Sequence, residues 1–77
     1  MNKIELILRI KTVINEAHNF SKNLGAPTSI HRDYLLAKLN DVSPTEIHIG
    51  LLDLKDQGQI EFGNDPNVIV LTEKYKQ

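Results

Sequence analysis

The apolar residues near the N-terminus recur with the period of an α-helix. At about 100° per residue, seven of them fall within one arc of about 140°, and charged or polar residues lie opposite. The pattern predicts a helix over residues 3–20 that packs by one face. The seven residues are Leu6, Ile7, Ile10, Val13, Ile14, Ala17 and Phe20.

Two more aliphatic residues, Ile4 and Leu8, lie outside that arc and one helical turn apart. Single exposed aliphatic side chains are common on protein surfaces, and this is one interpretation of the pair. The other is a second seam that packs against another subunit.

The segment that follows contains strong helix breakers, Gly25 and Pro27. Thr28 and Ser29 come next, either as N-caps of a second helix or as the start of a short strand before it. The residues from Ile30 to Leu39 are apolar enough for a buried helix, which the following Asn-Asp pair ends. The apolar positions of that helix are Ile30, Tyr34, Leu35, Leu36 and Leu39.

The stretch "SPTEI" predicts the start of a third helix. Ser43 is the N-cap, Pro44 occupies the first helical position, and Glu46 completes a capping box. Four residues project within about 60° of one another and therefore face the core, and the last of them also supplies the C-cap. They are Ile47, Leu51, Leu54 and Gly58.

Two short apolar runs, "QIEF" and "VIVL", close the pattern. The turn-forming residues "GNDPN" separate them, so this segment predicts a β-hairpin. In the final "TEKYKQ", Thr72 is placed to cap one further helical turn.

This order of elements resembles a winged helix-turn-helix domain. "YLLAKLNDVSPTEIHIGLLDL" is similar to the two-helix unit, "LKDQGQIEF" to the passage from the recognition helix into the wing, and "VIVLTEKY" to the ending of small bacterial or phage regulators, with Tyr75 replacing the usual glycine. The resemblance implies an α+β fold, a three-helix bundle with a C-terminal two-stranded β-hairpin wing, as one domain over residues 1–77. Most such domains regulate transcription, and a minority bind other proteins.

The composition adds two constraints. Nine basic and ten acidic residues give a formal net charge of −1, whereas dedicated nucleic-acid binders are usually basic. The chain has no cysteine, so it has no disulfide and no thiolate metal site. Because charges interrupt its N-terminal apolar run and no run reaches the length of a membrane span, we expect a cytoplasmic chain without a membrane partner.

The residue types on the outward side of the third helix bear on which of two functions the sequence favours. Thr45, Ile49, Leu52 and Asp56 lie at its centre. Side chains that read base edges are usually Arg, Lys, Asn or Gln, and none of these stands at the centre. His48 and Lys55 flank one side of this surface, and Glu46 and Asp53 flank the other.

The first hypothesis, which follows mainly from the resemblance, is a small DNA-binding transcriptional regulator. Residues 44–57 would dock in the major groove of double-stranded DNA. The residues nearest the bases would be Thr45, His48, Ile49 and Lys55, and Arg32 and Lys38 would hold phosphate.

The second hypothesis is a winged helix that binds a protein partner. Its apolar anchors would be Ile4, Leu8, Ile49 and Leu52. A homodimer is compatible with both hypotheses. A further interpretation is that the C-terminal turn with Tyr75 covers Ile49 and Leu52.

Nothing in the sequence predicts an enzyme. "HRDYLLAKLN" begins like a protein-kinase catalytic loop but lacks the leucine and the asparagine that complete that motif. We therefore expect no catalytic residue, no cofactor and no metal. The three histidines, which do not have the spacing of a zinc site, are His18, His31 and His48.

Overall fold

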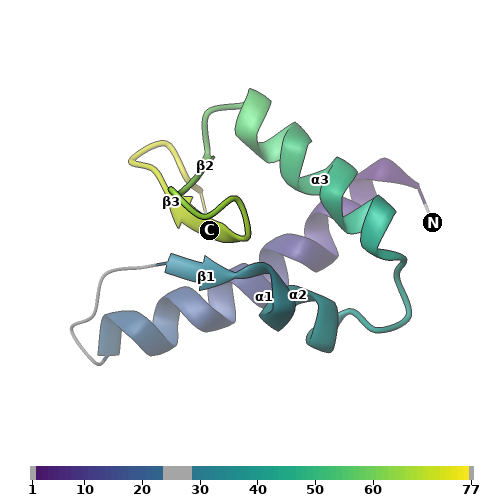
Figure 1. Cartoon of the computed structure of the whole chain (residues 1–77), viewed down its shortest axis with the longest axis horizontal. Coiled ribbons are helices and arrows are strands. Elements are labelled where there is room, and N and C mark those ends of the chain that lie inside the picture. The colour runs from purple at the N-terminus through teal and green to yellow at the C-terminus, as the bar shows by residue number, and fades with distance from the viewer. Residues whose placement is uncertain (1, 24–28, 77) are drawn as a thin grey trace.

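The computed structural model describes residues 2–23 and 29–76, which form three helices and one antiparallel sheet of three strands (Figure 1). The α+β class expected from the sequence is confirmed. Along the chain, the elements are α1 (Lys3–Asn23), β1 (Ser29–His31), α2 (Arg32–Lys38), α3 (Pro44–Asp56), β2 (Ile60–Phe62) and β3 (Val68–Leu71).

The first helix, α1, packs by the predicted face. Its fully or almost fully buried residues are Leu6, Ile10, Val13 and Ile14. The expectation that Phe20 shares this face is wrong, because its side chain is 67% exposed. Ala17 is the last described side chain of α1 that packs against the core, so the final turns of the helix extend past it.

The segment predicted as one helix from Ile30 to Leu39 is a strand followed by a shorter helix. Ile30 is buried in β1, and there it pairs with Ile69 of β3. His31 is the N-cap of α2, because its Nδ1 accepts a hydrogen bond from the Asp33 N–H at 3.1 Å. The short-strand alternative is therefore confirmed, and the helical one is wrong for the first two residues. Gly25, Pro27 and Thr28 lie outside the described residues.

The third helix begins at Pro44 with Ser43 as its N-cap, as predicted. The Ser43 hydroxyl accepts a hydrogen bond from the Glu46 N–H at 3.1 Å and lies 3.4 Å from the Glu46 carboxylate. At the other end, Gly58 has a φ of 76°, a left-handed conformation that glycine adopts without strain. The Gly58 N–H donates to the Lys55 carbonyl and the Gln59 N–H to the Leu54 carbonyl, which is the Schellman arrangement.

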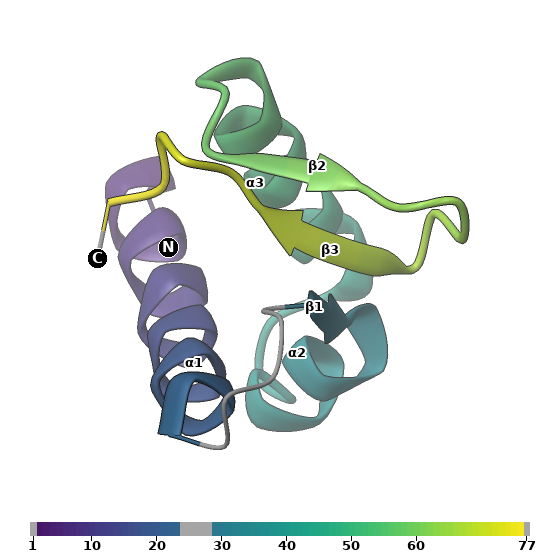
Figure 2. The ribbon, with the colours of Figure 1, turned by 90° about the vertical axis from the view of Figure 1, so that its left-hand side faces the viewer.

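The hairpin joins a third strand, so the sheet has one strand more than the two expected. The strand order is β1-β3-β2, with β3 antiparallel to both neighbours. The β2–β3 loop, residues 63–67, projects away from α1, and the C-terminal tail returns toward α1 (Figure 2). After β3, the Tyr75 N–H donates to the Thr72 carbonyl in a turn, and the further helical turn expected at Thr72 is absent from the described tail.

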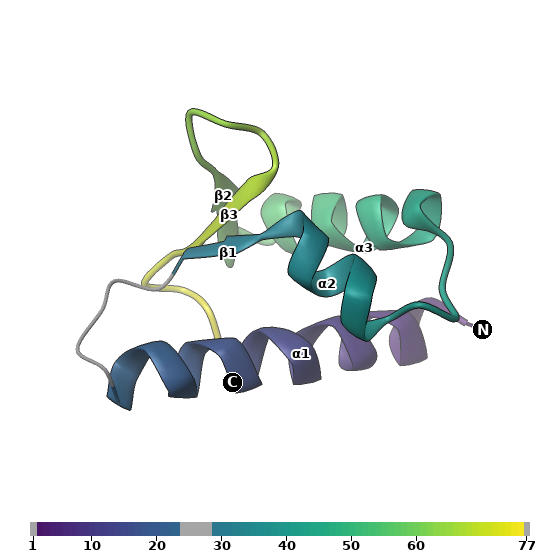
Figure 3. The ribbon, with the colours of Figure 1, turned by 60° about the horizontal axis from the view of Figure 1, so that its bottom comes forward.

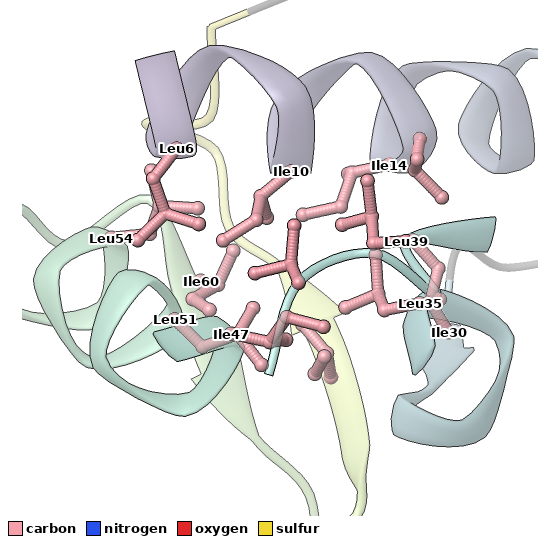
Figure 4. Packing of buried hydrophobic residues seen from close by; sticks show 13 residues of the cluster. Leu6, Ile10, Ile14, Ile30, Leu35, Leu39, Ile47, Leu51, Leu54 and Ile60 are labelled. Carbon is pink, nitrogen blue, oxygen red and sulfur yellow. The ribbon is translucent and has the colours of Figure 1, made fainter. Parts of the chain in front are cut away.

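The core lies between α1, α2, α3 and the sheet (Figure 4). Gly50 lets α1 and α3 approach closely, because a Cβ atom there would overlap Ile10 Cδ1 and also contact Ile7 Cδ1 at 3.6 Å. The largest fully buried side chains, which come from all of these layers, are Ile10, Ile14, Leu35, Ile47, Leu51, Leu54, Ile60 and Ile69.

Candidate functional site

The outer face of α3 is exposed to solvent as the sequence predicted. Ile49 is 51% and Leu52 is 39% exposed, although both are large aliphatic residues. Their polar neighbours on this face are exposed too: Thr45, His48, Lys55 and Asp56. The face is therefore aliphatic at its centre and carries both signs of charge at its edges.

A shallow apolar groove lies beside this face, between α1 and α3. Ile4 and Leu8, 74% and 60% exposed, line it together with Ile7. Its volume is about 260 Å³. An ion pair between Lys3 Nζ and Asp53 Oδ1, 3.1 Å apart, borders the groove on both helices.

The groove and the outer face of α3 are neighbours on the helix surface. Ile49 precedes Asp53 by four residues, and side chains with this spacing lie next to each other on a helix. All four residues expected to anchor a protein partner are thus exposed. Ile4 and Leu8 line the groove, Ile49 lies next to Asp53 at its border, and Leu52 is exposed on the same helix.

Arg32 lies where α2, α3 and the β2–β3 loop meet. Its Nη1 donates to His48 Nδ1 at 2.8 Å, and its Nη2 donates to the Pro66 carbonyl at a longer 3.5 Å. The guanidinium carbon is 5.7 Å from the centroid of the Phe62 ring. Arg32, which was expected to hold phosphate, is therefore already hydrogen-bonded within the protein. One of its partners is His48, which was expected to lie near the bases.

The remaining cations proposed for DNA are spread apart. Lys38 ends α2, about 9 Å along the helix axis from Arg32, and lies 5.8 Å from the Tyr34 ring. Lys55 is exposed in the last turn of α3, beside Asp56. The exposed residues of the hairpin include two carboxylates, those of Glu61 and Asp65. This region therefore has no predominantly basic surface.

The C-terminal tail packs on α1 and leaves the outer face of α3 uncovered. The Tyr75 hydroxyl donates to Asn15 Oδ1 at 2.5 Å, and Lys11 Nζ lies 5.3 Å from the Tyr75 ring centroid. Burial raises the pKa of Tyr75 to about 12. The interpretation that Tyr75 covers Ile49 and Leu52 is wrong.

Within residues 2–23 and 29–76, no group of three or more His, Cys, Asp or Glu side chains is arranged to hold a metal ion. None of the helices described is long and apolar enough to cross a bilayer.

Comparison of the chain with protein-family models, curated proteins and solved structures finds no match. The contacts that sequence reasoning missed, such as Arg32 with His48 and Lys3 with Asp53, join residues far apart in the chain. No local pattern marks such pairs before the fold is known.

Proposed function

We propose that this chain is a winged-helix domain that binds a protein partner through the outer face of α3 and the neighbouring α1–α3 groove. The order of helices and strands supports the winged-helix assignment, with β2, β3 and their loop as the wing. In this arrangement α3 occupies the position of the recognition helix.

The exposure of four large aliphatic residues carries the proposal. Ile4, Leu8, Ile49 and Leu52 all project from α1 and α3 into solvent. Neighbouring exposed apolar side chains gain free energy when a partner covers them, at about 25 cal/mol per Å² of apolar surface removed from water. Charged residues at the margin, such as Lys55 and Asp56, fit the polar rim of a protein interface.

The proposal is tested by affinity capture from cells of the source organism. The bait is the wild-type chain, and the test variant is Ile49→Ser with Leu52→Ser. Preys are quantified by mass spectrometry, and each retained prey is purified and titrated against both baits. A specific partner should bind the wild type and lose at least tenfold in affinity for the variant, because truncated anchors at an interface centre typically cost 2 kcal/mol or more.

The matched control is Lys55→Ser with Asp56→Ser, which alters exposed polar residues of the same helix. It should change the affinity much less than the aliphatic pair, since charges at an interface rim contribute little. A partner that binds the aliphatic variant and the wild type equally would eliminate this surface as its binding site.

DNA binding is the second candidate, favoured by the position of Arg32 and His48. Both lie at the junction of α2, α3 and the β2–β3 loop, where a winged helix would meet a duplex. Fluorescence anisotropy with random duplex DNA, titrated from low to physiological salt, measures this directly. If Arg32 and Lys38 hold phosphate, replacing both by Ala should reduce the log–log salt slope by about 2. An unchanged slope would remove these two residues from the DNA-binding surface.

A further inference from the structure

The contact between Arg32 and His48 depends on the protonation state of the imidazole. An arginine side chain carries only hydrogen-bond donors, so Nδ1 of His48 must be the acceptor in the 2.8 Å bond. This requires the neutral ring with its proton on Nε2. A doubly protonated imidazole has no acceptor, and it would place a second positive charge against the guanidinium.

Arg32 also connects this contact to the β2–β3 loop. Its Nη2 reaches the Pro66 carbonyl, its guanidinium lies over Phe62, and its backbone N–H donates to the Asn67 carbonyl at 2.7 Å. The loop projects beyond the helices (Figure 3). Arg32 Nε is buried and has no hydrogen-bond partner among the described residues, so the bonds at Nη1 and Nη2 must hold the guanidinium in place.

The elements that carry this contact also bear charges of both signs. Asp33 follows Arg32 in α2, and Lys55 lies two turns after His48 along α3. Glu61 and Asp65 stand in the hairpin, next to Phe62 and Pro66 respectively. Within the described part of the chain, none of the carboxylates forms an ion pair with Arg32 or His48. No carboxylate is therefore already paired with His48 in a way that would offset the repulsion between a protonated imidazole and Arg32.

We propose that the hydrogen bond between Arg32 and His48 is a pH-dependent switch that holds the β2–β3 loop in place. Neutral His48 holds the guanidinium beside Pro66 and Phe62. Protonation of His48 releases Arg32, loosens the loop and frees a cation next to the outer face of α3. This switch does not depend on whether the outer face of α3 binds protein or DNA.

The test is two-dimensional NMR of the full chain between pH 7.5 and pH 5.5, a range in which histidine side chains change charge and carboxylates do not. The readouts are the His48 ring resonances and the amide hydrogen exchange of Arg32, Gly63 and Val68. The Gly63 N–H donates a hydrogen bond to the Val68 carbonyl, and the Val68 N–H donates one to the Asp65 carbonyl. After correction for intrinsic exchange, protection of these amides should fall about fivefold at the acidic end, the equivalent of losing one net hydrogen bond. The change should have the same midpoint as the His48 ring.

Three variants test whether the response comes from the contact between Arg32 and His48. His48→Asn keeps an acceptor oxygen close to the position of Nδ1 and takes up no proton, so its loop should stay protected across the whole range. His31→Asn keeps an N-cap for α2 and removes the other histidine of this region, so its loop should respond as the wild type does. Arg32→Gln removes the guanidinium and should leave the loop poorly protected at both pH values.

Three results would overturn the proposal. One is a loop that responds to pH in His48→Asn as it does in the wild type. Another is a response that disappears in His31→Asn. The third is a His48 ring that titrates while the protection of all three amides stays constant.

Discussion

Gly50 is the residue at which the packing of α1 against α3 leaves no space for a side chain. A methyl group there would overlap Ile10 Cδ1, and Ile10 is fully buried. Overpacking of this kind typically costs about 1–3 kcal/mol, whereas alanine gains only about 1 kcal/mol over glycine in a helix. We expect Gly50→Ala to lower the free energy of unfolding by about 1 kcal/mol in urea denaturation.

Gly63 provides the matched control for this substitution. A Cβ atom there would lie 3.6 Å from Val68 Cβ, an ordinary van der Waals distance, and its φ is not positive. Gly63→Ala should therefore change the stability by less than about 0.5 kcal/mol. A Gly50→Ala variant more stable than the wild type would contradict the close approach of the two helices.

The ion pair between Arg9 and Asp41 gives a second prediction for single residues. Arg9 Nη1 and Nη2 donate to the two oxygens of Asp41 at 2.8 and 2.7 Å. These hydrogen bonds lower the pKa of Asp41 below its ordinary value of 3.8. The contribution to stability is therefore complete above that value and is lost as the pH falls through the lower folded pKa.

NMR titration of the Asp41 carboxyl carbon checks this prediction. In Arg9→Gln, the pKa of Asp41 should return toward 3.8, and the variant should resemble the wild type in stability most closely at the acid end of the titration. An Asp41 pKa that is the same in both proteins would show that Arg9 does not bind this carboxylate in solution.

Among the elements, α3 depends most clearly on a local signal at its start. The Ser43 hydroxyl satisfies the Glu46 N–H, which otherwise has no partner within the helix. Ser43→Ala should therefore destabilise the protein by about 1 kcal/mol, while Ser43→Asp, which retains a capping oxygen, should stay close to the wild type. Thermal unfolding followed by circular dichroism measures both, and an alanine variant as stable as the aspartate variant would contradict the capping role.

The elements that the sequence could predict have either such local signals or, as in α1, a clear helical period. The cap at Ser43, the glycine at the end of α3 and the turn residues of the hairpin each act within a few residues of themselves. β1 has no such signal, because its conformation comes from pairing with β3 about forty residues later in the chain. The same limit applies to the site. Periodicity placed Ile49 and Leu52 on the outside of α3, but the bond from Arg32 to His48 requires the tertiary fold.

For the molecule as a whole, the C-terminal tail closes the fold by returning to α1. Desolvation raises the pKa of Tyr75 to about 12, so the folded chain favours the neutral phenol more than the unfolded chain does. Between the ordinary value of 10.0 and 12 the unfolded chain loses this proton first, and the stability contributed by Tyr75 should fall as the pH rises through that range.

Absorbance at 295 nm in Tyr34→Phe, which leaves Tyr75 as the one tyrosine, gives its pKa directly. The midpoint should lie well above 10 in the folded protein and return toward it in denaturant. A midpoint near 10 in the native protein would mean that the tail does not pack on α1.

The exposed aliphatic residues should contribute to binding and hardly at all to folding. Exposed substitutions usually change stability by less than about 0.5 kcal/mol each, so Ile49→Ser with Leu52→Ser should cost under about 1 kcal/mol. Leu51→Ser makes a comparable chemical change one residue away at a fully buried position. It should cost 3 kcal/mol or more, because it leaves a cavity and buries a hydroxyl. Urea denaturation of the two variants measures the contrast directly. Equal losses would mean that Ile49 and Leu52 are covered within the chain itself, and the α3 surface would then have no free aliphatic anchors for a partner.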